Sequence, residues 1–357
     1  METAEKVDFY SLTLPDLQSY FTDLGKEKFR AQQLFKWVYE KKVTDPEAMT
    51  NLSKEFRKNL LDRITFDLPE MVDRRISTDG TRKYLFDIGK GQTVEAVMIP
   101  SEDRMTLCLS SEVGCNMACT FCFTGKQKLK RRLTAGEIVG QFLQVKIDME
   151  DKRISNIVFM GMGEPLDNTK AVFDAIDIFK SDYGLNVSRK KITVSTSGLI
   201  PQIPLVTESG TRLAISLNAP NDEVRNNIMP INKRYPLAEL MEACRTHTRD
   251  SKDQVTFEYV LLKDVTDHID HARQVAQLIK GIPCKVNLIP FNEHPDSGFQ
   301  RPSRNKVFDF QRYLVGKGFH VTIRRTMGRD IFAACGQLTS LYKGRPQKQD
   351  VSTGVLG

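Results

Sequence analysis

The sequence lacks long apolar runs, and none approaches the roughly 20 residues that a helix needs to span a bilayer. Its N-terminus, METAEKVDFYSLTLPDL, also lacks the basic region followed by an apolar region that marks a secretory signal peptide. There is no internal repeat and no low-complexity block. We therefore expect a soluble, cytoplasmic protein without a membrane partner.

Cysteine is sparse, with seven residues spread unevenly over 357 positions. An odd, scattered set is a poor framework for disulfide bonds and better suits metal-binding or redox residues in a reducing compartment. Neither sign of charge dominates, because 52 lysines and arginines against 45 acidic residues leave a net charge of +7. This excess is compatible with an anionic partner such as nucleic acid, but it is not diagnostic. With 40% hydrophobic residues, the chain can build a well-buried core.

Residues 1–70 are predicted to form a helical domain. Apolar residues recur at helical spacing in LPDLQSYFTDLG, KFRAQQLFKWVYEKK and SKEFRKNLLDRI. Four basic residues in this part form either a basic face or an ordinary solvated surface: Lys26, Lys28, Arg30 and Lys36. Residues 71–100 contain two expected strands joined at GKGQ, a hairpin turn signal, and we predict a small β-hairpin extension there.

Residues 101–340 alternate between β-rich runs and helical segments. Strands are expected in MTLCLSS, NIVFMGM, KITVSTS, RLAISLN, VTFEYVLL and KVNLIPF, and a last strand, FHVTIRRT, follows a helix over 303–317. Such repeats pair their strands in parallel, which predicts an α/β fold with a full or partial barrel or a doubly wound sheet. The polar segment 341–357 is expected to be a flexible tail.

Polar or glycine-rich clusters follow four of these strands: GMGEP, STSG, SLNAP and PFN. Barrel enzymes build their sites from the loops at the carboxyl ends of the strands. Four clusters on one rim suggest a single ligand surrounded by a barrel mouth. This arrangement favours a partial barrel of six strand–helix units over an open sheet.

Three cysteines, Cys115, Cys119 and Cys122, lie in GCNMACTFC with the spacing C-x3-C-x2-C. Thiolates at this spacing can hold three corners of a cubane iron–sulfur cluster, which leaves the fourth iron open to a ligand. Zinc is the alternative, but it prefers four protein ligands or three plus water, usually with C-x2-C pairs. No fourth cysteine lies nearby, and the nearest downstream histidine is His247.

CNMACTFC resembles the signature of radical S-adenosylmethionine (SAM) enzymes, which have a partial (β/α)6 barrel of TIM-like form. This resemblance implies a [4Fe-4S] cluster on the three cysteines, with the amino and carboxylate groups of SAM on the open iron. One electron then cleaves SAM to a 5′-deoxyadenosyl radical. GMGEP resembles the loop of this family that binds the SAM amino group, which implies that role for Gly163 and Glu164.

A wider resemblance, over residues 8–342, is to the RlmN family of dual-specificity RNA (adenine-C2)-methyltransferases. It is carried by FRAQQLFKW, VEAVMIP, TLCLSSEVGC, MGMGEPLDN, VSTSGLIP, LAISLNAP, MPINKRYP, NLIPFN and AACGQL. The resemblance implies methylation of adenosine 2503 in the peptidyl transferase centre of 23S ribosomal RNA. It also implies adenosine 37 of transfer RNA as a second target, two SAM molecules per turnover, and a flavodoxin or ferredoxin as electron donor.

The RlmN resemblance also implies residue roles. Cys335 accepts a methyl group from a first SAM, and a second SAM gives the radical that removes a hydrogen atom from this methyl. The methylene radical adds to C2, Glu95 accepts the C2 proton, and Cys108 releases the RNA by forming a transient disulfide with Cys335. Five further residues match the SAM-binding positions of the family: Ser195, Ser216, Leu217, Asn218 and Asn292.

The RlmN resemblance implies RNA as the partner, and phosphate neutralisation by basic residues supplies most RNA affinity. Five basic residues follow the cysteine loop and are predicted to flank the RNA approach: Lys126, Lys128, Lys130, Arg131 and Arg132. We expect residues 1–70 and the hairpin to help grip the folded RNA, and we expect a monomer.

Two alternatives remain open at this point. Cfr-type enzymes, the sister group of the RlmN family, share these cysteines but methylate C8; GMGEP and the full N-terminal region favour C2. A non-catalytic RNA-binding protein with a structural zinc is the alternative from another class. CFTG, where the family commonly has CATG, departs at Phe123 without touching a residue assigned a chemical role.

Overall fold

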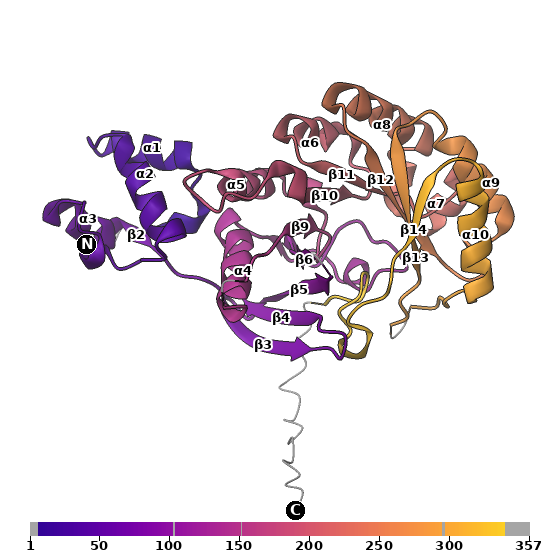
Figure 1. Ribbon diagram of the computed structural model, residues 1–357, viewed down its shortest axis with the longest axis horizontal. Coiled ribbons are helices and arrows are strands. Elements are labelled where there is room, and N and C mark those ends of the chain that lie inside the picture. Colours follow the sequence, from indigo (N-terminus) through magenta and orange to yellow (C-terminus); the bar gives the residue numbers. More distant parts are fainter. Residues whose placement is uncertain (1–5, 103, 151, 295–296, 340–357) are drawn as a thin grey trace, which may run out of the picture.

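The structure is a computed structural model, and it describes residues 6–102, 104–150, 152–294 and 297–339. The predicted tail, 341–357, lies outside the described residues. Figure 1 shows two unequal parts: a group of helices near the N-terminus and a larger part built around a curved sheet.

The N-terminal part is helical, as predicted. It contains α1 (Leu14–Asp23), α2 (Phe29–Phe35) and α3 (Lys54–Arg63), and the short strands β1 (Val7–Asp8) and β2 (Ile64–Thr65) pair in parallel. The helices begin at capping residues, because the hydroxyls of Thr13 and Ser53 accept hydrogen bonds from backbone N–H groups of the first turns of α1 and α3. Buried aromatic residues form the centre of this part: Phe9, Tyr10, Phe21, Phe35, Tyr39 and Phe56.

Three antiparallel strands connect this part to the barrel: β3 (Glu70–Ile76), β4 (Arg82–Asp87) and β5 (Thr93–Ser101). The two predicted strands are β4 and β5, and β3 is an additional one at the edge of the sheet. β5 pairs antiparallel with β6 (Arg104–Cys108), so the extension continues the main sheet. The sheet has ten strands in the order β14-β13-β12-β11-β10-β9-β6-β5-β4-β3.

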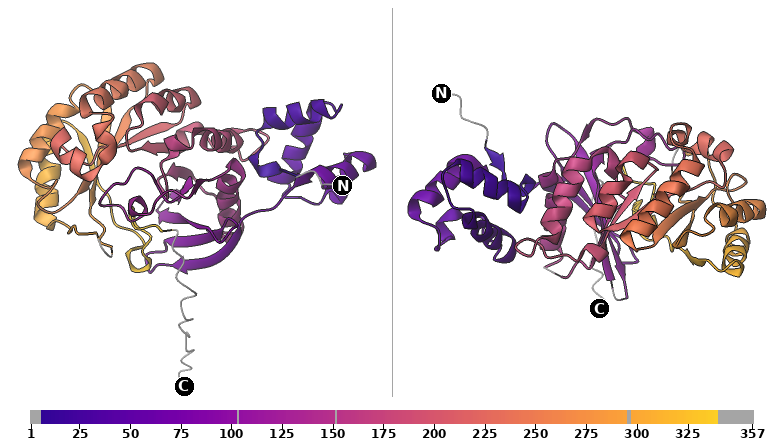
Figure 2. Two further views of the ribbon diagram at one scale, coloured as in Figure 1. Left: turned by 180° about the vertical axis from the view of Figure 1, so that it is seen from behind. Right: turned by 90° about the horizontal axis from the view of Figure 1, so that it is seen from above.

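Seven of these strands pair in parallel and form the predicted partial barrel. After β6 come β9 (Asn156–Phe159), β10 (Ile192–Thr196), β11 (Arg212–Ser216), β12 (Val255–Leu261), β13 (Cys284–Pro290) and β14 (His320–Ile323). The intervening helices are α4 (Ala135–Asp148), α5 (Thr169–Lys180), α6 (Ile203–Ser209), α7 (Asp222–Ile228), α8 (Leu237–Ser251), α9 (Ile269–Leu278) and α10 (Arg304–Gly316). Figure 2 shows them on the outer side of the curved sheet.

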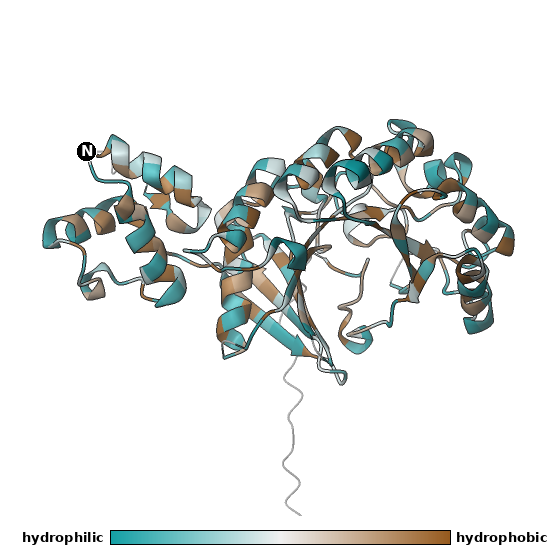
Figure 3. Cartoon of the chain, turned by 45° about the horizontal axis from the view of Figure 1, so that its top comes forward, coloured by the Kyte–Doolittle hydropathy of each residue, from teal (hydrophilic) through white to brown (hydrophobic). Residues whose placement is uncertain are grey.

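The core lies between the sheet and these helices. In Figure 3 the helices carry bands of both hydrophobic and hydrophilic residues, as expected for helices with one buried face. Residues such as Phe159 on β9, Val194 on β10 and Phe179 on α5 are fully buried. The barrel wall is therefore a firm support for the loops at its carboxyl rim.

A separate two-stranded ribbon lies after β6. β7 (Glu112–Val113) pairs antiparallel with β8 (Arg131–Arg132), and the loop between them carries all three cysteines of the C-x3-C-x2-C motif. Because β7 and β8 pair with each other, the two ends of this 17-residue loop, residues 114–130, lie side by side.

Candidate active site

The cysteine loop is tightly folded, and two glycines permit this. A Cβ on Gly114, whose φ is +82°, would lie 2.3 Å from the carbonyl oxygen of Lys128 on the other side of the loop. A Cβ on Gly125 would lie 2.7 Å from the carbonyl oxygen of Cys119. Glycine is required at both positions because any side chain would push the strands of the loop apart.

The three cysteines line one cavity, which we call the cysteine cavity. Among the described residues, the single group of three possible metal ligands with all donor atoms within 4.8 Å of one another is Asp264, Asp267 and His268. The motif sulfurs are therefore spread more widely than one tetrahedral zinc ion would hold them. A cubane cluster fits better, because it presents a separate iron to each thiolate.

The cysteine cavity is open to solvent, and its space of about 1000 Å³ includes part of the adjoining solvent. Its walls come from the carboxyl ends of several parallel strands, as the polar clusters of the sequence predict. The predicted residues that line it are Cys115, Cys119, Cys122, Gly163, Glu164, Ser195, Ser216, Asn218, Asn292 and Cys335. Leu217 is fully buried and lies outside this lining.

Glu164 is one of two buried carboxylates that line the cavity, and the other is Glu258. One oxygen of Glu164 accepts a hydrogen bond from the backbone N–H of Ser197 at 2.7 Å and the other from that of Leu166 at 3.1 Å. Burial raises the pKa of Glu164, and these hydrogen bonds, together with the Ser197 side chain, oppose the shift. A cationic group of a ligand would favour the charged carboxylate, which suits the ammonium group of SAM.

Glu112 supports this loop and was not predicted from the sequence. Its carboxylate accepts a hydrogen bond from the backbone N–H of Glu164 at 2.9 Å. A Cβ on Gly163 would lie 2.5 Å from the Cβ of Glu112. Only glycine therefore lets the backbone at residue 163 pack this closely against the Glu112 side chain. Burial raises the pKa of Glu112 to about 8, because the nearby Arg132 compensates only in part. No sequence signal distinguishes Glu112 from a surface acid.

Asn218 and Ser195 are held by the strands at the rim. The Asn218 side-chain oxygen accepts from the Val260 N–H at 3.0 Å, and its backbone is left-handed with φ at +56°. The Ser195 hydroxyl donates to the carbonyl oxygen of Phe159 at 2.8 Å. Both side chains are thus fixed by neighbouring strands before any ligand binds.

Arg225 is a second unpredicted residue, and it is fully buried on α7. Its guanidinium donates to the carbonyl oxygens of Ser197 at 2.6 Å, Ser216 at 3.1 Å and Leu217 at 3.0 Å. These carbonyls belong to the rim after β10 and β11. Arg225 therefore braces the two strand ends that carry the predicted SAM-binding serines. Burial lowers its pKa to about 10, so it remains a cation near Cys119.

Cys335 lies between two cavities. It lines the cysteine cavity and also a second cavity whose walls include Cys108, Arg104, Arg324 and Arg325. Cys335 is solvent-accessible and Cys108 is buried, and both cysteines are free thiols. The structure thus brings these two distant cysteines to one cavity. Burial raises the pKa of the Cys108 thiol, whereas the Arg324 guanidinium acts to lower the pKa of both thiols.

Glu95 on β5 is only 6% exposed and lies outside the described lining of both cavities. One carboxylate oxygen lies 3.0 Å from the ammonium of Lys83, and the other accepts from the backbone N–H of Thr339 at 2.9 Å. Burial raises the pKa of Glu95, and Lys83 opposes this shift. Glu95 is therefore tied to the segment that follows Cys335.

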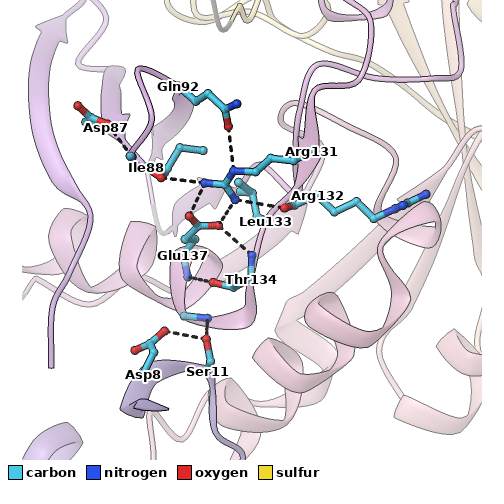
Figure 4. Close-up of polar contacts among 12 residues, drawn as sticks. Asp8, Ser11, Asp87, Ile88, Gln92, Arg131, Arg132, Leu133, Thr134 and Glu137 are labelled. Carbon is cyan, nitrogen blue, oxygen red and sulfur yellow. Dashed lines mark hydrogen bonds and ion pairs between the residues drawn. The ribbon is translucent and has the colours of Figure 1, made fainter. Parts of the chain in front are cut away.

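The basic run after the cysteine loop divides into two kinds of residue. Arg131 is structural: its guanidinium binds both oxygens of Glu137, at 2.6 and 2.7 Å, and the Ile88 carbonyl at 2.8 Å (Figure 4). Arg132 bonds to Asp167. In contrast, Lys128 and Lys130 are exposed, and within the described ranges no ion pair is found for either.

The described residues contain no helix long and apolar enough to cross a membrane. The acidic group at Asp264 and Asp267 is occupied by the ammonium of Lys306, which lies 2.8 and 3.3 Å from their carboxylates.

Comparisons with known proteins give consistent matches. The family model of the radical SAM superfamily matches residues 110–276, and the model of the ribosomal RNA large subunit methyltransferase N-terminal domain matches residues 7–65. A dual-specificity RNA methyltransferase RlmN from Bdellovibrio bacteriovorus is 61% identical over 99% of this chain and 88% of its own length. The same enzyme from Geotalea uraniireducens is 48% identical over 96% of this chain and 98% of its own length.

A solved structure matches the whole fold. The crystal structure of a radical SAM methyltransferase from Sphaerobacter thermophilus superimposes with a TM-score of 0.88 at 40% identity, and it covers 94% of this chain and 100% of that chain. The matched length includes the N-terminal helices, the three antiparallel strands and the partial barrel.

Proposed function

This chain belongs to the RlmN family of dual-specificity RNA methyltransferases, within the radical SAM superfamily, and we propose on that premise how its residues methylate RNA. It is an enzyme that transfers a methyl group from SAM to C2 of adenosine in ribosomal and transfer RNA. The observation that carries the proposed mechanism is the position of Cys335 between the cysteine cavity and the cavity that contains Cys108.

Cys115, Cys119 and Cys122 would hold a [4Fe-4S] cluster, and Glu164 with the rim residues of the cavity would bind SAM. When bound, these cofactors supply a carbon radical by one-electron cleavage of SAM. The protein orients both groups, because Glu112 and Arg225 hold the GMGEP loop and the strand ends from behind. Leu217 contributes to this binding through the rim backbone, since its carbonyl is fixed by Arg225.

Cys335 carries the methyl group. Its thiol loses a proton and would take the methyl from a first SAM: the S–CH3 bond of that SAM breaks, a new S–CH3 bond forms on Cys335, and S-adenosylhomocysteine leaves. A hydrogen atom of this methyl would then pass to the 5′-deoxyadenosyl radical from a second SAM. The carbon radical left on Cys335 can add to the electron-poor C2 of adenine, where ordinary nucleophilic attack on SAM is not available. Arg324 favours the thiolate, because it places a positive charge beside Cys335.

Glu95 accepts the C2 proton from the adduct, and the unpaired electron of the adduct would return to the iron–sulfur cluster. Its buried position raises its pKa, which suits a proton acceptor near neutral pH, and Lys83 keeps the carboxylate charged and oriented. Cys108 then attacks the sulfur of Cys335, so that the bond between this sulfur and the methylene carbon breaks and a disulfide forms. The released carbon takes up a proton and becomes the C2 methyl group.

We further propose a separate role for each part of the chain. Residues 1–70 form the RNA-binding accessory domain, residues 71–100 carry Glu95, and residues 101–340 are the catalytic core. The exposed Lys128 and Lys130 beside the cavity support an RNA path there. We expect a monomer in the cytoplasm that receives electrons from a flavodoxin or ferredoxin, and all seven cysteines are free, as a reducing compartment requires.

Nucleoside analysis tests the reaction. The anaerobically reconstituted enzyme is incubated with SAM and ribosomal or transfer RNA, and the digested nucleosides are separated and identified by mass spectrometry. We expect 2-methyladenosine from both RNAs. Formation of 8-methyladenosine would assign Cfr-type chemistry instead. A protein that binds one zinc, without iron or sulfide, would contradict the radical mechanism.

A further inference from the structure

The turn between β3 and β4 lies against the loop that leads from β14 to Cys335. The Asp330 carboxylate accepts hydrogen bonds from the Ser77 hydroxyl at 2.5 Å and from the Thr78 N–H at 3.2 Å. In the opposite direction, the Asp79 carboxylate accepts from the Gly328 N–H at 2.8 Å. Figures 1 and 2 show this loop, in yellow, beside the ends of β3 and β4. The two segments are about 250 residues apart in sequence and bind each other reciprocally.

Residues 328–333 of this loop form a compact turn, which we call the held turn. The Ala333 N–H donates to the Gly328 carbonyl at 2.9 Å, which closes the loop on itself two residues before Cys335. A Cβ on Gly328, whose φ is +65°, would lie 2.9 Å from the Thr81 side chain and 2.7 Å from that of Ala333. The turn and the loop are therefore in close contact, and a shift of one displaces the other.

A third contact comes from β4. The ammonium of Lys83 donates to the carbonyl oxygen of Phe332 at 3.1 Å and also pairs with Glu95. On the far side of Cys335, the chain is bound to the cysteine loop, since the Phe123 N–H donates to the Gly336 carbonyl at 2.8 Å. The Thr124 hydroxyl donates to the Leu338 carbonyl at 2.7 Å. Hydrogen bonds therefore hold the chain on both sides of Cys335, to the β3–β4 turn and β4 before it and to the cysteine loop after it.

We propose that the β3–β4 turn and the loop before Cys335 form a clasp, in which Asp79 on the turn and Asp330 on the loop are positioning residues that hold Cys335 at the boundary of the two cavities. The proposal rests on the proposed function, because it assumes that Cys335 carries the methyl group. Neither aspartate lines either cavity. Asp330 is exposed, and Asp79 is half-buried and also accepts a hydrogen bond from the Thr81 N–H at 2.9 Å within the turn.

The first test of the clasp measures how readily trypsin cleaves the Cys335 loop. Arg324, Arg325 and Arg329 are exposed and offer trypsin sites before and within the held turn. We expect Asp79→Ala/Asp330→Ala to increase the rate of tryptic cleavage at these sites about tenfold, because local opening becomes more frequent. Ser77→Ala, which removes one of the two bonds to Asp330, should give a smaller increase. Asp309→Ala removes an exposed aspartate that pairs with Arg312 on α10 and serves as the matched control.

The second readout is kinetic. With Cys335 less well placed, kcat for RNA methylation should fall about tenfold, whereas KM for RNA and for SAM stays within about twofold. Asp330→Asn keeps one acceptor oxygen and should restore part of the loss. Unchanged cleavage in the double variant would overturn the clasp. Faster cleavage with unchanged kcat would overturn the positioning role. If the wild-type enzyme made no methyladenosine while the cleavage pattern changed as expected, the proposed function would fail and the clasp would stand.

Discussion

The barrel rim and the Cys335 loop contribute to the same site, but they are held in different ways. The rim residues follow parallel strands and are fixed by the sheet and by buried groups such as Arg225 and Glu112. The Cys335 loop follows the edge strand β14 and is held by single hydrogen bonds to segments far away in the sequence, the β3–β4 turn on one side of Cys335 and the cysteine loop on the other. The rim therefore has the support of the sheet, whereas the position of Cys335 depends on a few separate contacts.

The largest expected effect is the loss of the iron–sulfur cluster, which should follow from a change in the cysteine loop and not from a change in the Cys335 loop. Cys119→Ala should lose the iron–sulfur cluster, its brown colour and all methylation, because two thiolates do not retain a cubane stably. Cys335→Ala should bind iron and sulfide as the wild type does and yet make no methyladenosine. Iron and sulfide analysis with a methylation assay checks both variants. Loss of iron in Cys335→Ala would show that this cysteine belongs to the metal site.

The next effect concerns Glu95, which is tied to the segment after Cys335 through Thr339. Glu95→Gln keeps the shape and a hydrogen-bond acceptor but cannot take up the C2 proton at neutral pH. We expect kcat to fall by a factor of about 10²–10⁴, the usual contribution of a general base. Single-turnover assays with RNA measure this rate. Wild-type turnover in this variant would exclude Glu95 as the proton acceptor.

A smaller effect distinguishes the two kinds of basic residue after the cysteine loop. Lys128→Ser/Lys130→Ser should weaken RNA binding and reduce its salt dependence, with a change of about 0.7 in the log–log slope for each lost phosphate contact to single-stranded RNA. Thermal stability should remain unchanged, because both lysines are exposed.

Arg131→Ala is the matched comparison. It should lower the free energy of unfolding by roughly 2 kcal/mol, since Glu137 and the Ile88 carbonyl lose their partner. Denaturant titration and RNA binding at several salt concentrations check both variants. An unchanged salt slope in the lysine variant would remove these residues from the RNA path.

The last expected effect is a pH dependence within the rim. The pKa of Glu112 is raised from 4.5 to about 8 in the folded protein, so the folded state binds more protons than the unfolded state between these values. Stability of the metal-free protein should therefore fall as the pH rises from about 5 to 8. Glu112→Gln should flatten this decline, whereas Glu239→Gln at an exposed site should not. Urea denaturation at several pH values measures the slope, and an equal decline in all three proteins would contradict the assignment.

The sequence predicts the fold and most of the cavity lining for a physical reason. Short strands alternating with helices force parallel pairing, and parallel pairing brings the polar strand ends together on one rim. Ser195, Asn218 and Asn292 therefore meet at the cavity, as the pattern predicts. The C-x3-C-x2-C spacing is local, so a single loop suffices to bring its thiols to one wall.

The supporting residues could not be predicted in this way. Arg225 lies on a short helix where an arginine usually faces water, and only the tertiary structure shows that it is buried and bonded to three strand-end carbonyls. Asp79 and Asp330 occupy ordinary turn positions, and their contacts join segments about 250 residues apart. The additional strand β3 was missed because its burial does not follow its polarity: Asp73 and Arg75 are half-buried, whereas Val72 and Ile76 are exposed.

The most direct test of the account is the fate of the RNA in Cys108→Ala. If Cys335 carries the methyl group and Cys108 releases it, this variant should accumulate a covalent protein–RNA adduct, and mass spectrometry of the digested adduct should locate the linkage between the Cys335 sulfur and C2 of adenine. Cys284→Ala, at a cysteine outside both cavities, should release methylated RNA as the wild type does. Free methylated RNA released at the wild-type rate by Cys108→Ala would contradict the account.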